Sequence, residues 1–186
     1  KWLVLIQLSY TRVSIRENPF MFNGFAVDME DVDWLRSVLS IEREVRPPGS
    51  KKSEIKILNG NCVKLYDNDR IVAYAEMRMV GSHMEISTVL VDPEYRNKGY
   101  GKRLVKEAFK KINHDKILCC TKNPAMAKVL QSLDFKITKW PGFWTNFILL
   151  INTIKRLFSM LIRLDFKRIW QQGKGILRYN QFEMIR

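Results

Sequence analysis

The sequence predicts an α/β (α+β) domain built on a mixed, mostly antiparallel sheet flanked by helices. Three strand-like segments joined by tight turns lie between residues 62 and 91, and short turns of this kind connect antiparallel strands. After residue 91 the apolar spacing becomes helical and then alternates with short strand-like runs. A chain of 186 residues is long enough for a real core, and we expect one domain over residues 1–186.

The first third of the chain predicts strands and then a helix. Residues 1–18 mix Val, Ile, Tyr and Thr with polar residues, which favours one or two strands. Residues 28–44, DMEDVDWLRSVLSIERE, repeat apolar positions at helical spacing behind an acidic start, which suits the helix dipole. Residues 46–53, RPPGSKKS, contain two prolines and a glycine and are expected to form a loop.

The middle of the chain predicts a meander and two helices. The strands are expected at residues 62–66, 71–80 and 83–91, and Asp92-Pro93 ends the third because proline cannot donate to a strand ladder. A basic amphipathic helix follows around residues 104–112, then a strand at 116–121. A second helix is expected over 123–135, with Asn123 as N-cap and Pro124 in the first turn, before a strand at 136–140.

The net charge of +13 favours an anionic partner, such as nucleic acid, an acidic membrane surface or a polyphosphate, although a solvated basic surface also explains it. Residues 1–60 are nearly neutral, with 9 basic and 8 acidic side chains. Residues 61–140 carry 15 against 9, and residues 141–186 carry 8 against 2. The excess therefore lies in the second and third parts of the chain.

Compartment and targeting signals are sparse. Three cysteines, two of them adjacent, form no disulfide framework, so we expect a reducing, cytoplasmic environment. The apolar start, KWLVLIQL, is shorter than the ~20 residues of a membrane span and lacks a cleavage pattern. We therefore expect neither an anchor nor a leader there.

Gly99 and Gly101 lie between a strand end and a helix start. Such a junction points unpaired backbone N–H groups at one place, where the helix dipole adds positive potential, so it suits a phosphate. Glycine allows close approach of a ligand and a positive φ. The loop is not a Walker A motif, because Arg96 stands where the first glycine is needed, and not a dinucleotide fingerprint, because Leu104 replaces its third glycine.

The stretch ISTVLVDPEYRNKGYGKRLVKEAF resembles the acetyl-coenzyme A loop of the GCN5-related N-acetyltransferase (GNAT) superfamily. Arg96, Gly99 and Gly101 fill the signature Arg/Gln-x-x-Gly-x-Gly/Ala. Downstream, NPAMAKVLQSLDF is similar to the family's second signature, an asparagine at a strand end followed by a helix ending in Leu-Gly-Phe. The resemblance covers residues 60–140 well, residues 1–60 by element order, and residues 141–175 not at all.

The resemblance implies acetyl-coenzyme A as co-substrate and a primary amine as acceptor, acetylated by direct attack in a ternary complex. The pyrophosphate is expected on the loop amides, the pantetheine arm along the backbone of residues 88–91, and the thioester where the strands at 83–91 and 116–121 splay apart. The implied cofactor-binding residues are Val89, Leu90, Val91, Arg96, Asn97, Lys98, Gly99, Tyr100, Gly101, Lys102 and Asn123.

Catalytic candidates follow from the same resemblance, and no metal ligand is assigned. Glu85, near the start of the strand before the loop, is the first candidate for general base, although an alternating surface glutamate explains it equally well. Glu76 and His83 are reserves, and His83 is expected to be exposed in a turn. Leu130 stands where many relatives have a tyrosine that protonates the thiolate, so water, another group or no acid at all does that work.

About 35 residues separate the predicted strand at 136–140 from a last strand at about 176–185. This insert, residues 141–175, is apolar and basic, and its apolar residues predict one helical face. Three readings stay open: a wall over the substrate cleft, a dimer contact, or a basic amphipathic helix in a membrane interface, with packing onto the sheet or another subunit the commonest case.

We therefore expect an acetyl-coenzyme A-dependent N-acetyltransferase. Its basic charge would suit an amine carried on an anionic molecule such as an acidic peptide, a nucleotide or aminoacyl-tRNA. The rival function is a non-catalytic acyl-coenzyme A-binding or nucleic-acid-binding module of the same fold. A homodimer is a further expectation.

Overall fold

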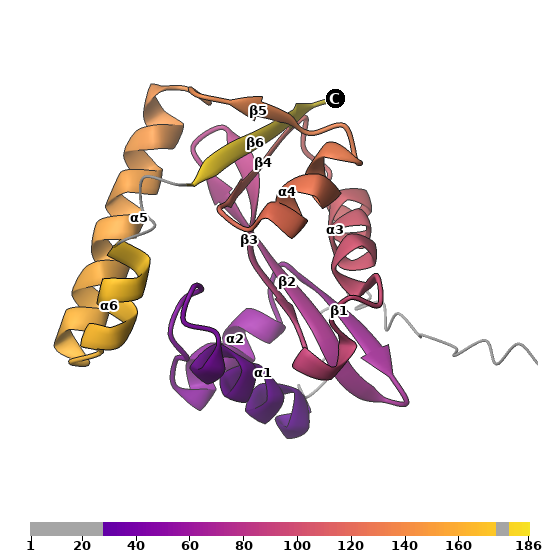
Figure 1. Ribbon diagram of the computed structural model, residues 1–186, viewed down its shortest axis with the longest axis vertical. Helices are drawn as coiled ribbons and strands as arrows, with labels where there is room; N and C mark the ends of the chain where they lie inside the picture. Colours follow the sequence, from indigo (N-terminus) through magenta and orange to yellow (C-terminus); the bar gives the residue numbers. More distant parts are fainter. Residues whose placement is uncertain (1–27, 174–178) are drawn as a thin grey trace, which may run out of the picture.

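The computed structural model describes residues 28–173 and 179–186, which form a six-stranded sheet with helices on both faces (Figure 1). The strand order is β1-β2-β3-β4-β6-β5, and every neighbouring pair is antiparallel except β3 with β4. The predicted mixed, mostly antiparallel sheet is confirmed. The strands expected within residues 1–18 lie outside the described residues. The strands are β1 (Cys62–Asp67), β2 (Arg70–Val80), β3 (His83–Val91), β4 (Lys116–Thr121), β5 (Lys136–Thr138) and β6 (Asn180–Ile185).

Each face of the sheet has its own apolar core. Helices α1 (Met29–Ile41) and α2 (Lys51–Leu58) pack on one face with side chains of β1, β2 and β3. Helices α3 (Tyr100–Lys111) and α4 (Pro124–Gln131) cover the other face. The alternation of β2 serves both cores, since Tyr74 points to the first and Ala73 and Ala75 to the second.

Two predicted boundaries are wrong because of local capping. The loop expected through residue 53 ends at Ser50, whose side chain accepts the Ser53 N–H and starts α2 at Lys51. The helix expected through residue 135 ends at Gln131, because Asp134 takes a left-handed conformation with φ 64°. The predicted caps of α4, Asn123 and Pro124, are confirmed.

The insert forms two antiparallel helices, α5 (Phe143–Ile162) and α6 (Phe166–Gly173), at the left of Figure 1. Leu164, with φ 54°, makes the reversal between them. The start of α5 packs closely on the turn between β2 and β3, where a Cβ at Gly81 would lie 2.6 Å from Oγ1 of Thr145. Gly81 also has φ +61°, so both the space and the backbone require glycine there.

The apolar stripe of the insert is not packed onto the sheet within the described residues, so that part of the expectation is wrong, while packing onto another subunit stays a prediction. Phe143, Ile154 and Phe158 are exposed, whereas Thr145 and Met160 on the opposite side of α5 are buried. The helix therefore turns its polar side to the protein and its apolar side away from it.

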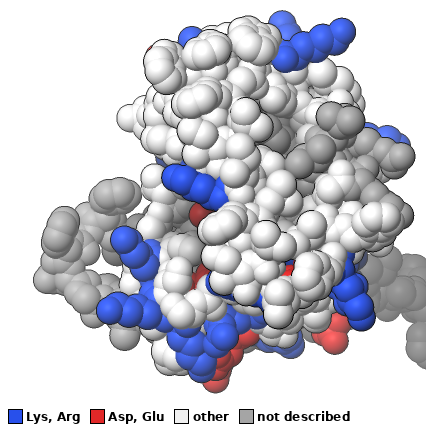
Figure 2. Space-filling view, turned by 90° about the vertical axis from the view of Figure 1, so that its left-hand side faces the viewer, with Lys and Arg blue, Asp and Glu red and all other residues white. Residues whose placement is uncertain are grey.

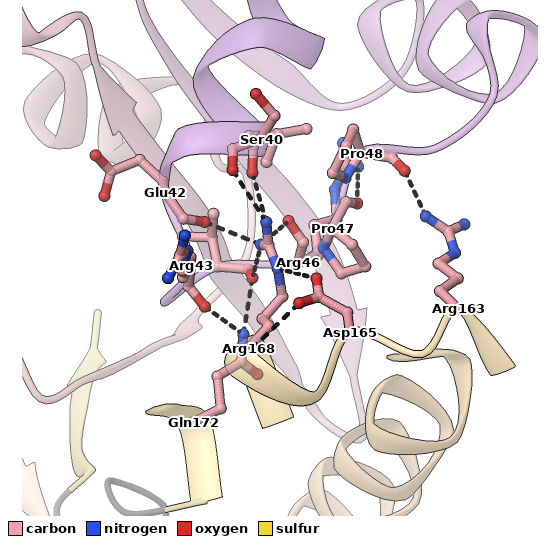
Figure 3. A network of polar contacts seen from close by, with 12 residues as sticks. Ser40, Glu42, Arg43, Arg46, Pro47, Pro48, Arg163, Asp165, Arg168 and Gln172 are labelled. Atoms are coloured by element: carbon pink, nitrogen blue, oxygen red, sulfur yellow. Dashed lines mark hydrogen bonds and ion pairs between the residues drawn. The ribbon is translucent and has the colours of Figure 1, made fainter. Parts of the chain in front are cut away.

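Arg168 fastens the far end of the insert to the loop after α1 (Figure 3). Its side chain is buried, and its guanidinium donates to the carbonyls of Leu39 at 3.0 Å, Glu42 at 3.0 Å and Val45 at 3.2 Å, while Nε pairs with Asp165 at 3.0 Å. The side-chain amide of Gln172 also donates hydrogen bonds to the carbonyls of Arg43 and Val45. The negative end of the α1 dipole thus meets a buried cation, which fixes α6 in place.

We predict that Arg168→Met destabilises the protein by about 2–4 kcal/mol, because several buried carbonyls would lose their donor. Chemical denaturation measures this, and limited proteolysis should show faster cleavage between α5 and α6. Lys167→Met is the matched control, since Lys167 is exposed, and it should change stability by less than about 0.5 kcal/mol. Equal losses in both variants would contradict the role given to Arg168.

Candidate functional site

A cleft opens where β3 and β4 separate. These two strands pair at Met84 with Ile117 and at Glu85 with Leu118, and beyond that point the described residues show no further pairing between them. The predicted splay is confirmed. A cavity of about 1000 Å³ lies there, bounded by β3, β4, the loop before α3, the start of α4, the polar side of α5 and the loop after α1.

The loop before α3 presents free backbone donors to this cavity. Asn97 and Gly99 have positive φ values of 60° and 83°, which turn the chain into the first turn of α3. No side chain caps α3 in the described structure, whereas Asp28, Ser50 and Asn123 cap α1, α2 and α4. The first N–H groups of α3 therefore keep their capacity to bind an anion.

Gly101 is not required by the fold itself. A Cβ at this position would meet Cγ2 of Val91 at 3.9 Å, an ordinary contact. Both glycines line the cavity, together with Asn97 and Lys102. A diphosphate fits this place, because the loop offers donors and open space on the side where a side chain would otherwise stand.

The predicted basic residues of the loop behave differently from one another. Arg96 lines the cavity, but its guanidinium is ion-paired with Glu42 at 2.5 Å and also donates to the Val91 carbonyl. Lys98 lies over the Tyr95 ring, and Tyr100 packs edge-on against that ring, so neither lines the cavity. Lys102 is thus the predicted cation that lines the cavity without a pairing carboxylate among the described residues.

The cavity side of β3 provides a free backbone edge. Val89, Leu90 and Val91 pair with β2 on one side, and β4 has diverged on the other. All three line the cavity, as does Asn123, whose side chain accepts the N–H groups of Ala125 and Met126. An extended arm with amide groups can add to this edge as another strand would.

Two predicted carboxylates line the cavity near the splay. Glu85 is buried, and its Oε2 accepts a hydrogen bond from Nε of Arg78 at 2.8 Å. Glu76, at an irregularity in the β2–β3 pairing, receives Nε of Arg46 at 3.3 Å. Arg46 is held in turn by both oxygens of Glu54. Burial acts to raise the pKa of Glu54. The hydrogen bonds from Arg46 and the Gly49 N–H outweigh this effect, so the pKa of Glu54 lies below its usual value and the carboxylate stays charged.

His83 differs from its expected exposure. It begins β3 and is buried rather than exposed, with Nδ1 at 3.1 Å from Oγ1 of Thr145 and Nε2 at 2.7 Å from Oε1 of Glu183. It does not line the cavity. His83 joins β3, β6 and the start of α5, which is a structural task.

No proton donor replaces the family tyrosine in α4. Leu130 is fully buried in the core between the sheet and helices α3 and α4. Cys120 lines the cavity, but burial and the nearby Glu85 charge raise its pKa to about 12. Tyr95 donates to Asp67, and that bond raises its pKa.

Across the described residues, no three His, Cys, Asp or Glu side chains group as a metal site would need.

Sequence reasoning missed a set of cations that line the cavity, here called the cationic wall, of which Lys122 is ion-paired with Glu44 at 3.0 Å. Arg46, Arg78, Lys122 and Arg156 all line the cavity, and Nε of Arg156 is buried without a hydrogen-bond partner among the described residues. Tyr179, just before β6, lines it too, beside Lys122. The sequence did contain a signal for the cavity-lining side of α5, namely the polar residues opposite the apolar stripe.

Comparisons with known proteins agree with this geometry. Residues 31–135 match the family model described as Acetyltransferase (GNAT) family, more than half of the chain. No curated protein matches the chain by sequence. A solved N-acetylglutamate synthase from Neisseria gonorrhoeae, complexed with coenzyme A and N-acetyl-glutamate, aligns over 93% of this chain and 35% of its own, with a TM-score of 0.60 and 13% identity. The chain thus spans about a third of that synthase.

Two further structures extend the likeness. Diaminobutyrate acetyltransferase from Paenibacillus lautus, solved with its substrate and coenzyme A, covers 69% of this chain and 80% of its own, with a TM-score of 0.51 and 13% identity. An acetyltransferase from Thermus thermophilus covers 87% and 94%, with a TM-score of 0.52 and 11% identity. At these identities the likeness concerns the fold. The family match, the splayed strands and the uncapped glycine loop together make the chain a member of the acetyltransferase (GNAT) family.

Proposed function

We propose that the protein transfers an acetyl group from acetyl-coenzyme A to a primary amine. The observation that carries this proposal is the alignment of an uncapped α3 start, a free β3 edge and two carboxylates along one cavity. A pyrophosphate on the loop amides directs the pantetheine arm along Val89–Val91, and the thioester then lies near Glu85. Coenzyme A bound in the neighbouring structures supports this choice of co-substrate.

In the proposed reaction the amine attacks the thioester carbonyl, and the coenzyme A thiolate leaves. Glu85 accepts the proton that the ammonium must lose before attack. Its Arg78 partner has an exposed fraction of 44% and can move away when substrate arrives. The thiolate is a good leaving group, so Leu130 in place of a tyrosine does not block the reaction. The enzyme contributes mainly by holding both reactants in position.

The cationic wall supports an acceptor that carries an anionic group beside its amine. Arg156 has a buried nitrogen in need of an acceptor, and carboxylate or phosphate oxygens meet that need with charge-assisted hydrogen bonds. Two neighbouring enzymes were solved with amino-acid ligands, N-acetyl-glutamate and diaminobutyrate, which supports a carboxylate-bearing amine.

The rival function is an acyl-coenzyme A-binding module without turnover. The ion pair of Glu85 with Arg78 and the buried Leu130 favour it, because the first occupies the candidate base and the second cannot donate a proton. Binding of acetyl-coenzyme A without release of free coenzyme A thiol, whichever amine of a panel is added, would decide for the module.

We expect Gly101→Val to weaken coenzyme A binding by at least about tenfold, because its side chain would stand where the pyrophosphate approaches the loop. Calorimetric titration measures the affinity. Gly101→Ala is the matched control, since the family signature admits alanine there and the position has room for a Cβ. Unchanged affinity in Gly101→Val, with the fold intact by circular dichroism, would remove the loop from the cofactor site.

Glu85→Gln is expected to lower turnover by about 10²–10⁴, the usual range for loss of a general base, with coenzyme A affinity changed less than about threefold. Release of free thiol over a panel of amines gives the rate. Glu76→Gln is measured in parallel. A large loss in Glu76→Gln together with normal turnover in Glu85→Gln would transfer the base role to Glu76.

For Arg156→Gln we expect KM to rise by about tenfold or more for amines that carry a carboxylate or phosphate, because a charge-assisted contact is lost. KM for neutral amines should stay within about twofold, which separates acceptor recognition from general damage. Lys167→Gln, on the exposed surface of α6 and outside the cavity lining, is the matched control. An equal rise for charged and neutral amines would contradict the proposed acceptor class.

A further inference from the structure

The outer face of the insert is an apolar surface whose side chains are exposed among the described residues. We define it by Phe143, Phe147, Ile154, Phe158 and Leu161 of α5 with Phe166 and Trp170 of α6, all exposed. Phe158 has an exposed fraction of 62% and Trp170 of 68%. At 100° per residue the five α5 positions fall within an arc of roughly 60°. Figure 2 looks onto this side of the molecule, where a broad surface without charged side chains, drawn white, has Lys and Arg toward its margins and some Asp and Glu toward the bottom of the view.

Charge within the segment that carries the outer face is almost entirely positive. Residues 136–173 contain 7 basic side chains and 1 acidic one, Asp165, which is paired with Arg168. Lys136 and Lys139 precede the insert, and Lys155 and Lys167 lie on α5 and α6, all exposed. Aromatic side chains beside exposed lysines suit the boundary between lipid headgroups and acyl chains.

α5 has the length and apolar character to cross a membrane, with 20 residues and a mean hydropathy of 1.3 in its best window. Its inner side argues for lying in the plane of the surface instead. Thr145 bonds to His83 at 3.1 Å, Asn146 to Gln181 at 3.2 Å, and Arg163 to the Pro48 carbonyl at 2.6 Å. These hydrogen bonds hold both ends of α5, and its polar side lines the cavity. Crossing a bilayer would break them and bury Lys155 and Arg156 in hydrocarbon.

We infer that the outer face docks the protein on an anionic lipid bilayer, with α5 and α6 in the interface plane. A second copy of the chain fits less well, because a two-fold contact would bring the same basic margins together. Anionic headgroups supply the opposite charge, and the acyl boundary takes up the aromatic side chains. This docking does not depend on acetyl transfer, so it can be tested separately from the proposed function.

The test is flotation of the full chain with vesicles of phosphatidylcholine, alone and mixed with phosphatidylglycerol. We expect binding to the mixed vesicles, at least about tenfold weaker binding to phosphatidylcholine alone, and weakening with salt. Phe158→Asn and Trp170→Asn should each reduce binding by about tenfold, since each removes a large exposed aromatic group. Ile41→Asn is the matched control, because Ile41 is equally exposed but belongs to α1, and it should bind like the wild type.

Failure of the wild type to bind mixed vesicles would overturn the inference, as would full binding by Phe158→Asn and Trp170→Asn. Size-exclusion chromatography identifies the competing occupant: a dimer that Phe158→Asn converts to a monomer, without vesicle binding, would assign the face to a second copy. Vesicle binding that appears only after removal of residues 1–27 would assign the outer face to that segment of the chain. It would equally overturn docking by the full protein.

Discussion

The early end of the β3–β4 ladder shapes everything else in the site. Parallel strands share their hydrogen bonds, so when β4 leaves β3 after Leu118, the backbone of β3 from residue 87 onward loses a partner on that side. Buried backbone groups need partners, and an extended ligand with amides can supply them. The loop and α3 then follow directly from the exposed end of β3, which aligns the anion-binding amides with the free edge.

Charge inside the cavity is arranged in pairs. Glu85 faces Arg78, and Glu76 faces Arg46, which Glu54 already holds with two bonds. Each pair places opposite charges within ion-pair distance at the cavity lining. The cavity therefore combines carboxylates with cations, and Nε of Arg156 has no hydrogen-bond partner among the described residues.

The insert connects this site to the outside of the molecule. One side of α5 lines the cavity, while the other forms the outer face, an inversion of the usual amphipathic helix of a globular protein. The inversion is stable because polar ties replace apolar packing: Thr145 at the start of α5, and Arg168 and Gln172 on α6. A buried arginine is costly without acceptors, and the carbonyls at the end of α1 provide them.

Local sequence signals determined the strands of the meander, the glycine loop and the capped start of α4, because turn residues, alternation and capping act between near neighbours. The loop was predictable for the same reason, since Arg96, Gly99 and Gly101 lie in one short stretch, whereas the free β3 edge was expected only from the family resemblance that this stretch carries. Tertiary structure alone decided which charges face one another: His83 became a buried link to Glu183, 100 residues away, and Arg46 and Arg156 came to the cavity from distant segments. It also decided the orientation of α5, because a helical period shows that a helix has two sides but not which side meets the protein.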